Sequence, residues 1–262
     1  MRKMLRVFVV VSAILSIGFS ASPAHAIDLQ DVWTFDNDTN YWKNSTSGGN
    51  SLYPSANFNG SIIAGLDATA NGVYLPGWTT LNGLNQVDIT ASSLNIAGDN
   101  NHYNIARGES FTFGATVKPL DPQPIINANL MKSGDTLNIM QKGLAGPNRE
   151  QWKLSINYSG KYICSFRGPN ASGVISDFKA VSKAYSYTTA RNVTCSLNNS
   201  VITMIIKTGN VVNQTVTAAG PKKVENTYDV IIGKKPFDTN PADTFAGTID
   251  AIAVRKTGSL NR

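Results

Sequence analysis

The sequence predicts an all-β protein, folded as a two-sheet antiparallel β-sandwich. Apolar and polar residues alternate over many short runs, which is the pattern of strands with one buried and one exposed face. Turn-forming Gly, Pro and Asn residues separate these runs at intervals of roughly 8–12 residues, a spacing typical of sandwiches and barrels. Beyond residue 26, no long segment places its apolar residues on one helical face.

The strands are expected where the alternation is clearest. Residues 152–158 place Trp152, Leu154, Ile156 and Tyr158 on one face, which suits a strand packed over a core between two sheets. Residues 45–71, rich in Asn, Ser and Gly, are predicted as loops and edge strands of the same domain. Further strands are expected at residues 111–117, 161–166, 193–197, 201–207, 211–216, 230–232 and 248–254.

The first 26 residues have the three parts of a secretory signal peptide. The basic, apolar and cleavage parts are Arg2, Lys3 and Arg6, residues 7–19, and Ala24-His25-Ala26. The apolar run is shorter than the roughly 20 residues that span a bilayer, although an uncleaved N-terminal anchor is the alternative. We therefore expect a secreted, extracellular protein with no membrane segment after cleavage.

The remaining chain, residues 27–262, is long enough for one large all-β domain or two small ones, and the absence of a clear linker favours one β-sandwich. The whole chain has 23 basic and 17 acidic residues, and the signal peptide holds three of the basic ones. The mature chain then carries 20 basic against 17 acidic residues, a net charge of +3. That is not the dense basic face of a nucleic-acid-binding protein. A monomer without a nucleic-acid partner is expected.

Two cysteines, Cys164 and Cys195, are expected to form a disulfide, because an exported chain meets oxidising conditions. Each lies in an alternating run, as expected for strands that lie side by side. Closing a loop of this size stabilises a fold by about 3–4 kcal/mol on the chain-entropy model. Two buried thiols are the alternative. Metal binding by these cysteines is disfavoured, because the mature chain has one histidine, His102, and no C-x-x-C motif.

Several motifs follow one another in an informative order. They are Val32-Trp-Thr-Phe-Asp36, SFTFGATVKP at 110–119, LMKSG at 130–134, residues 152–157, residues 191–207, and Ile231-Ile-Gly-Lys234 followed by FAGTIDAIAV at 245–254. In this order they resemble laminin G-like domains of the concanavalin A-like lectin/glucanase jelly-roll fold, over essentially the whole mature chain.

The resemblance implies a jelly roll in which the closing strand pairs with the first strand of the domain. It also implies cysteines on the strands of Cys164 and Cys195, as in a subgroup of secreted bacterial members. Two features depart from the family pattern. Ala190-Arg191-Asn192 replaces a Trp-His pair, and Thr208-Gly209 replaces an Asp-Gly turn.

Catalytic patterns of this fold are missing from the sequence. Retaining glycosidases need two carboxylates about 5–5.5 Å apart, and related members usually carry them as E-x-D-x(-x)-E. The three glutamates, Glu109, Glu150 and Glu225, lie in no such pattern. Lyases of this fold use Gln-x-His, which is absent, and His102 has no evident partner for a serine or cysteine triad. The sequence therefore predicts a protein that is not an enzyme, with a divergent polysaccharide lyase or glycoside hydrolase as an alternative.

Calcium is the candidate cofactor. It binds six to eight oxygen ligands, and Asp36, Asp38 and Asn40 alternate just after the first strand, where the family often places this ion. Residues 238–243 form a second oxygen-rich loop. The alternative for both segments is a set of polar turns, which Asn and Asp favour.

Aromatic side chains in or beside loops are candidates for contacts with sugar rings. They are Tyr41, Trp42, Tyr53, Tyr74, Trp78 and Tyr103. Core packing is the alternative for most of them. Tyr74 and Trp78 flank a Leu-Pro-Gly turn, and together with Tyr103 they are the predicted ligand-binding residues. The sequence thus predicts a non-catalytic lectin-like domain that binds an extracellular polysaccharide or glycoconjugate, with a structural or protein-adhesion module as the alternative.

Overall fold

The computed structural model describes residues 29–35, 45–46, 50–54, 60–64, 71–81, 86–90, 93–96, 101–132, 134–235 and 243–258. The predicted signal peptide, the predicted calcium ligands Asp36, Asp38 and Asn40, and most of the loop at 238–243 lie outside these residues. Among the described residues, no helix combines the length and the apolar character needed to cross a membrane.

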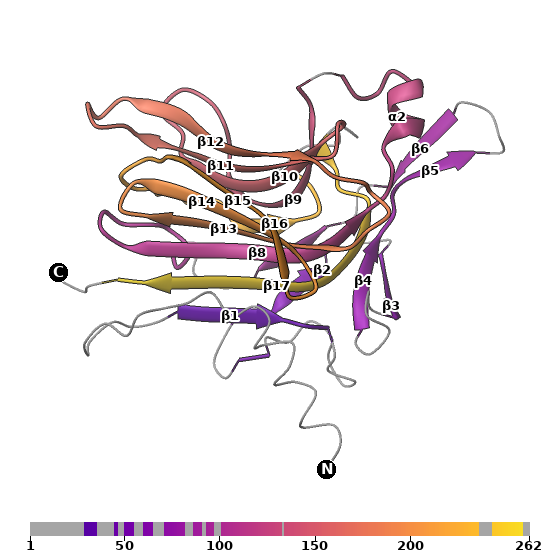
Figure 1. Ribbon diagram of the computed structural model, residues 1–262, viewed down its shortest axis with the longest axis horizontal. Coiled ribbons are helices and arrows are strands. Elements are labelled where there is room, and N and C mark those ends of the chain that lie inside the picture. The colour runs from indigo at the N-terminus through magenta and orange to yellow at the C-terminus, as the bar shows by residue number, and fades with distance from the viewer. Residues whose placement is uncertain are drawn as a thin grey trace, which may run out of the picture.

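Two antiparallel sheets, stacked face to face, make up most of the described chain (Figure 1). The strands of the first are β1 (Leu29–Trp33), β3 (Ser61–Ala64), β4 (Asn71–Leu75), β8 (Ser110–Pro119), β13 (Arg191–Asn198), β14 (Val201–Thr208), β15 (Val211–Ala219) and β17 (Gly247–Thr257). Their order in this eight-stranded sheet is β15-β14-β13-β8-β17-β4-β3, with β1 paired to β17.

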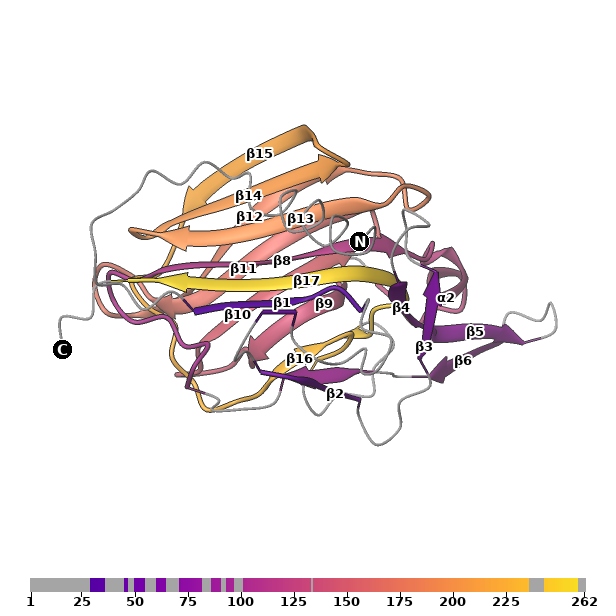
Figure 2. The same ribbon diagram turned by 90° about the horizontal axis from the view of Figure 1, so that it is seen from below.

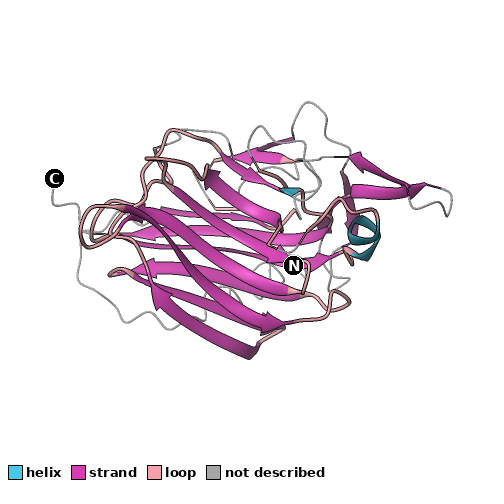
Figure 3. Ribbon diagram, turned by 90° about the horizontal axis from the view of Figure 1, so that it is seen from above, coloured by secondary structure: helices cyan, strands magenta, loops and turns pink. Residues whose placement is uncertain are grey.

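The second sheet has seven strands and faces the viewer's side in Figure 3. Its strands are β2 (Leu52–Pro54), β7 (Leu94–Ile96), β9 (Thr136–Gly143), β10 (Gln151–Asn157), β11 (Lys161–Pro169), β12 (Ile175–Ala184) and β16 (Val230–Ile232). Their order is β12-β11-β10-β9-β16-β7-β2. A separate hairpin of β5 (Gly77–Leu81) and β6 (Gln86–Thr90) and a short helix, α2 (Gln123–Asn127), complete the described elements. The predicted two-sheet antiparallel sandwich is confirmed.

The closing strand β17 lies in the interior of the eight-stranded sheet. One of its sides pairs with β8 along its whole length. Its other side pairs first with β4, at Gly247–Ile249, and then with β1, at Ile252–Lys256. Figure 2 shows β8, β17 and β1 running alongside one another. The pairing of the first and closing strands, which the family resemblance implied, is therefore present.

The core lies between the two sheets and is centred on aromatic rings. Phe113 projects from β8 of one sheet and meets Trp152 of β10 in the other, with 4.5 Å between ring centroids. Phe113 also meets Phe166 of β11 edge to face, at 5.8 Å. All three side chains are almost fully buried. Rings at these separations add to the free energy gained from burial alone.

The disulfide joins the two sheets across this core. Cys164 lies on β11 of the seven-stranded sheet and Cys195 on β13 of the eight-stranded sheet, and the two are bonded with 5.8 Å between their Cα atoms. The predicted pair is thus present, but its strands are not side by side in one sheet. They face each other, because the inward side chains of both strands point into the same core.

Candidate functional site

Tyr103, one of the predicted ligand-binding residues, belongs to the core. Its side chain is 2% exposed. Its hydroxyl donates a hydrogen bond to Asp31 Oδ2 and accepts one from Asn50 Nδ2, each at 2.7 Å. Burial raises the pKa of this hydroxyl, and the bond to Asn50 offsets part of that effect. These internal contacts hold Tyr103 in the core, and its ring is not exposed for packing against a sugar.

The other predicted residues are not brought together with Tyr103. Tyr74 is half-buried in β4, opposite Ser61. The backbone of Trp78 pairs with that of Ile89 in the β5–β6 hairpin. Because Tyr103 is buried, the three aromatic residues do not form one exposed surface. Calcium binding at Asp36, Asp38 and Asn40 stays a prediction, since these residues lie outside the described chain.

Polar side chains gather instead on the outer face of the seven-stranded sheet, where β9 contains a bulge. Leu154 of β10 lies opposite Met140, but Ser155, the next residue, lies opposite Asn138, so β9 contains one extra residue there. Bulges re-aim side chains relative to a regular strand. Here Leu137 and Met140 pack in the core, and Asn138 and Gln141 occupy the opposite face together with Ser155.

The strand register extends this face into a row. Tyr53 of β2 lies opposite Asn95 of β7, which lies opposite Ile231 of β16. Ile231 lies opposite Gln141, and Gln141 lies opposite Lys153. Neighbouring strands are about 4.8 Å apart, so the row forms a continuous strip across five strands. Tyr53, at one end, is 56% exposed and is the aromatic residue that the strip presents to solvent.

Several polar atoms on this face have no hydrogen-bond partner in the described structure. They are both amide atoms of Asn138, Gln141 Oε1, Ser155 Oγ and Asn95 Oδ1. Asn138, Gln141 and Ser155 are fully buried. A buried unpaired polar group costs about 1–3 kcal/mol, and native structures rarely keep one without an ordered water or a ligand to satisfy it. We call Asn95, Asn138, Gln141, Lys153 and Ser155 the polar face.

The Lys153 side chain lies along the polar face. Its Nζ donates to Thr136 Oγ1 at 3.0 Å. Thr136 lies opposite Asn157, four residues beyond Lys153 on β10, so the lysine must extend past Ser155 to reach it. Burial lowers the pKa of Lys153 to about 8, because water no longer solvates the ammonium fully. A single flexible side chain therefore passes over groups that lack partners.

Residues 233–235, which follow β16, and residues 243–245, which pair with them, lie beside the bulge. The Gly233 amide donates to the carbonyl of Ile139, the extra residue of β9, at 3.0 Å. Further along, the Lys235 ammonium pairs with Asp243 Oδ2 at 3.2 Å. Of the charges that act on Lys153, Asp243 and Asp177 raise its pKa, and Lys179 and Lys235 lower it. The face is thus rimmed by both signs of charge.

The glutamates of the described residues are engaged away from the polar face. Glu109 pairs with Lys256 at 2.9 Å, and Glu225 pairs with Lys223. Glu150 accepts a hydrogen bond from the backbone amide of Glu225, and burial raises its pKa. The part of the chain that the structure describes contains no cluster of three or more His, Cys, Asp or Glu that could hold a metal ion.

Sequence reasoning missed the polar face because it searched loops for aromatic residues. The groups that converge here are amides and a hydroxyl within strands, and the bulge that aims them breaks the alternation of β9. The signal that the sequence did offer for this site was the presence of two amide residues, Asn138 and Gln141, in a segment without clear alternation. Tyr53 was among the aromatic candidates, but its exposure depends on the pairing of β2 with β7.

No protein-family model matches the sequence, and a search of curated proteins likewise finds no match. Solved structures are similar in fold. Domain 4 of AbnA, an extracellular arabinanase from Geobacillus stearothermophilus, in complex with arabinotriose, is 14% identical with a TM-score of 0.48, over 87% of this chain and 92% of that one. The CBM40 domain of Ruminococcus gnavus IT-sialidase, bound to α2,3-sialyllactose, is 10% identical with a TM-score of 0.38, over 57% of this chain and 76% of that one.

Domains LG4-5 of the mouse laminin α1 chain are also similar, at 11% identity and a TM-score of 0.38, over 60% of this chain and 38% of that one. At identities of 10–14%, these proteins are related to the chain by fold alone. The chain is an all-β sandwich similar to carbohydrate-binding and laminin G-like domains.

Proposed function

We propose that the protein is a secreted, non-catalytic domain that binds an extracellular polysaccharide or glycoconjugate through the polar face. The observation that carries the proposal is the set of buried amide and hydroxyl atoms without partners on one face of the seven-stranded sheet. Their hydrogen-bonding capacity is unused in the free protein. A ligand that satisfies them recovers the free energy that their burial costs.

A saccharide fits the chemistry of these groups. Every sugar hydroxyl both donates and accepts hydrogen bonds, and the Asn138 side chain supplies both a donor and an acceptor. Ser155 does the same with one hydroxyl. Tyr53, exposed at the end of the same row, offers an apolar ring face against which a sugar ring can pack. The combination of an aromatic surface and a few convergent polar groups is typical of small-molecule sites.

Access to the polar face depends on Lys153. For a ligand to reach Ser155 and Asn138, we propose that this side chain swings away from Thr136, which breaks one hydrogen bond to a hydroxyl. Lys153 is half-buried, so this movement is a rotamer change of a partly covered side chain. The ammonium then stays available for a ligand oxygen. The buried disulfide between Cys164 and Cys195 supports export, since such bonds persist in oxidising compartments.

The test uses Asn138→Leu, which replaces an unpaired amide by an apolar group of similar size. We expect the melting temperature to stay the same or rise, because the cost of the unpaired amide is removed. We expect affinity for the bound saccharide to fall at least about tenfold. Affinity is measured by calorimetry, after a panel of polysaccharides and oligosaccharides that includes arabinotriose and α2,3-sialyllactose has identified the ligand.

Asn192→Leu is the matched control, because the same amide on the other sheet is satisfied by Thr116 and Thr194. It should lower the free energy of unfolding by about 1–2 kcal/mol and leave saccharide affinity unchanged. A wild-type protein that binds no saccharide of the panel contradicts the proposal. So does an Asn138→Leu variant that binds as tightly as the wild type.

A further inference from the structure

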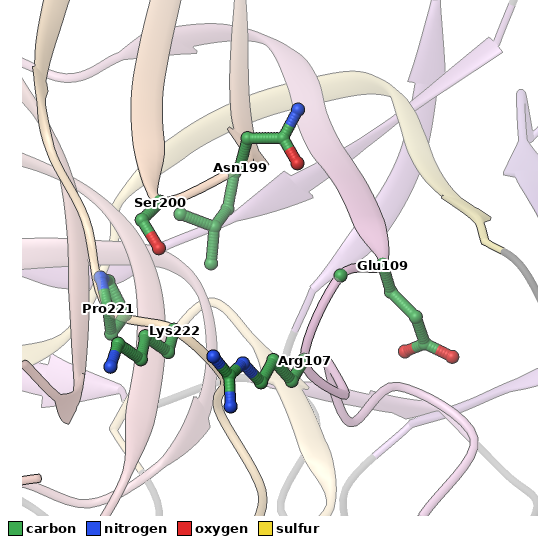
Figure 4. Close-up of a pocket in the computed structure, with 8 residues that line it drawn as sticks. Arg107, Glu109, Asn199, Ser200, Pro221 and Lys222 are labelled. Carbon is green, nitrogen blue, oxygen red and sulfur yellow. The ribbon is translucent and has the colours of Figure 1, made fainter. Parts of the chain in front are cut away.

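A hollow of about 250 Å³ lies at one end of the sandwich, on elements that do not contribute to the polar face. Three segments surround it: the turn before β8, the tip of the β13–β14 hairpin, and the segment that follows β15 (Figure 4). Leu197 and Pro221 give it an apolar lining, and Arg107, Ser200 and Lys222 bring polar groups to it.

The hollow carries a surplus of positive charge. Glu109 lies beside it, but Figure 4 shows its carboxylate pointing away, where it pairs with Lys256 at 2.9 Å and accepts the amide of Ala106. Arg107 is exposed and has no ion-pair partner among the described residues. Lys222 donates to the carbonyl of Ala171 at 3.0 Å, and no carboxylate in the described chain pairs with it. Among the described residues, neither of these two lining cations pairs with a carboxylate.

The wall opposite Arg107 is held in place by a tight turn. Asn198 and Val201 pair directly, so the β13–β14 hairpin closes with two residues, Asn199 and Ser200, both at positive φ (49° and 60°). This is the geometry of the preferred two-residue hairpin turn. The carbonyl of Ser200 also accepts the amide of Gly220 at 2.7 Å. In Figure 4 the Ser200 hydroxyl and the Arg107 guanidinium approach the hollow from opposite sides.

We infer that this hollow binds the carboxylate of an acidic saccharide unit. The planar guanidinium of Arg107 matches a carboxylate with two parallel hydrogen bonds, and the Lys222 ammonium adds a point charge. Ser200 donates from the opposite wall, and the buried side chains of Leu197 and Pro221 form the apolar base of the hollow. At about 250 Å³ the hollow is smaller than the roughly 300–1,000 Å³ of pockets for drug-sized ligands, as expected for a site that takes one sugar unit. The site stands on other residues than the polar face and does not depend on it.

The test titrates the full mature protein with sodium glucuronate, glucose, an oligogalacturonate and sodium sulfate, followed by NMR chemical shifts. We expect glucuronate to perturb the amides of residues 107–109 and 199–200, glucose to leave them unperturbed, and added salt to weaken binding. Arg107→Gln should weaken glucuronate about tenfold or more, and Arg107→Lys should bind with intermediate affinity, because it keeps the charge but loses the two-pronged geometry. Tighter binding of the oligogalacturonate than of glucuronate identifies a polymer as the source of the carboxylate.

Lys118→Gln is the control, because it removes the same charge from an exposed position at the far end of β8. It should leave glucuronate affinity unchanged. Equal binding of glucuronate by the wild type and Arg107→Gln overturns the inference, and so does sulfate that binds as tightly as glucuronate, since the latter indicates a site for any anion. Neutral saccharide binding that Arg107→Gln leaves intact separates this site from the polar face.

Discussion

Lys142 and Lys153 lie on neighbouring strands, yet the structure provides for their ammonium groups in different ways. Lys142 is fully buried on the core side of β9, and its Nζ donates to two carbonyls and to Asn226 Oδ1, at 2.8–2.9 Å. These three bonds use every donor that the ammonium has. Among the described residues, Lys153, on the outer face, donates one hydrogen bond, to Thr136. The contrast identifies Lys153 as the lysine whose position is weakly held.

The pKa of Lys153 makes this difference measurable. Its pKa is about 8 in the folded protein against 10.5 in the unfolded chain, so between these values the unfolded chain holds a proton that the folded protein lacks. The contribution of Lys153 to the free energy of unfolding therefore rises with pH from about 8 toward 10. Lys153→Met should abolish that rise, as measured by urea unfolding at pH 7.5, 8.5 and 9.5.

Lys118→Met, which removes an exposed lysine from β8, should keep the pH dependence of the wild type. Identical slopes for the wild type and Lys153→Met would contradict the assignment. The comparison stops below pH 10, because the buried hydroxyls of Tyr103 and Tyr162 have raised pKa values and act in the opposite direction at higher pH.

Individual site residues were the hardest part to predict from the sequence. Tyr53 and Tyr103 both stand in polar surroundings in the sequence, yet one is exposed and the other is buried. The difference arises from partners far along the chain: the hydroxyl of Tyr103 bonds Asp31 and Asn50, 72 and 53 residues away. No local pattern records such contacts, so aromatic composition alone could not separate a core residue from a surface one.

At the scale of elements, strands were predictable where burial follows a period of two. β10, β11 and β13 place their large apolar residues on one face, and all three were expected near their observed positions. β9 was not, because the bulge at its centre interrupts the alternation. β12 was missed as well, since it is an edge strand with mostly exposed or half-buried side chains and offers little apolar signal.

Two glycines allow a steric prediction at this scale. Gly160 and Gly173 both lie at positive φ, 73° and 83°, in turns beside β11. A Cβ at Gly160 would collide with the carbonyl oxygen of Tyr185, whereas a Cβ at Gly173 would meet open space. Gly173→Ala should therefore cost about 1 kcal/mol from the backbone alone. Gly160→Ala should cost at least about 1 kcal/mol more, because of the collision, as measured by urea unfolding. Equal losses would show that the Tyr185 segment moves aside freely.

At the scale of the whole molecule, the disulfide is a covalent cross-link between the two sheets, in addition to the backbone connections. The bonded residues are 31 positions apart, and both side chains are fully buried. The chain-entropy model gives about 3–4 kcal/mol for a loop of this length. The double variant Cys164→Ala/Cys195→Ala should lose about this much free energy of unfolding, or more if the vacated volume stays empty.

A thiol count provides the control for this prediction. The wild-type protein, denatured without reductant, should show no reactive thiol, and each single alanine variant should show one. Two reactive thiols in the wild type would contradict the bond.

The two-sheet architecture itself was predictable from the sequence, because it depends on repeated alternation. The placement of the cysteines in opposite sheets was not, because alternation does not say which strands share a sheet.

The interior position of β17 has a consequence for biosynthesis. β17 is the last strand of the described chain, yet β8, β1 and β4 all pair with it. More than 120 residues separate the end of β8 from the start of its partner β17, and the separation between β1 and β17 is larger still. When all earlier strands have been synthesised, the eight-stranded sheet still lacks β17, which lies between β8 and β4. Strands β15, β14, β13 and β8 can pair with one another earlier, but the sheet is complete only when residues 247–257 join β8 to β1 and β4.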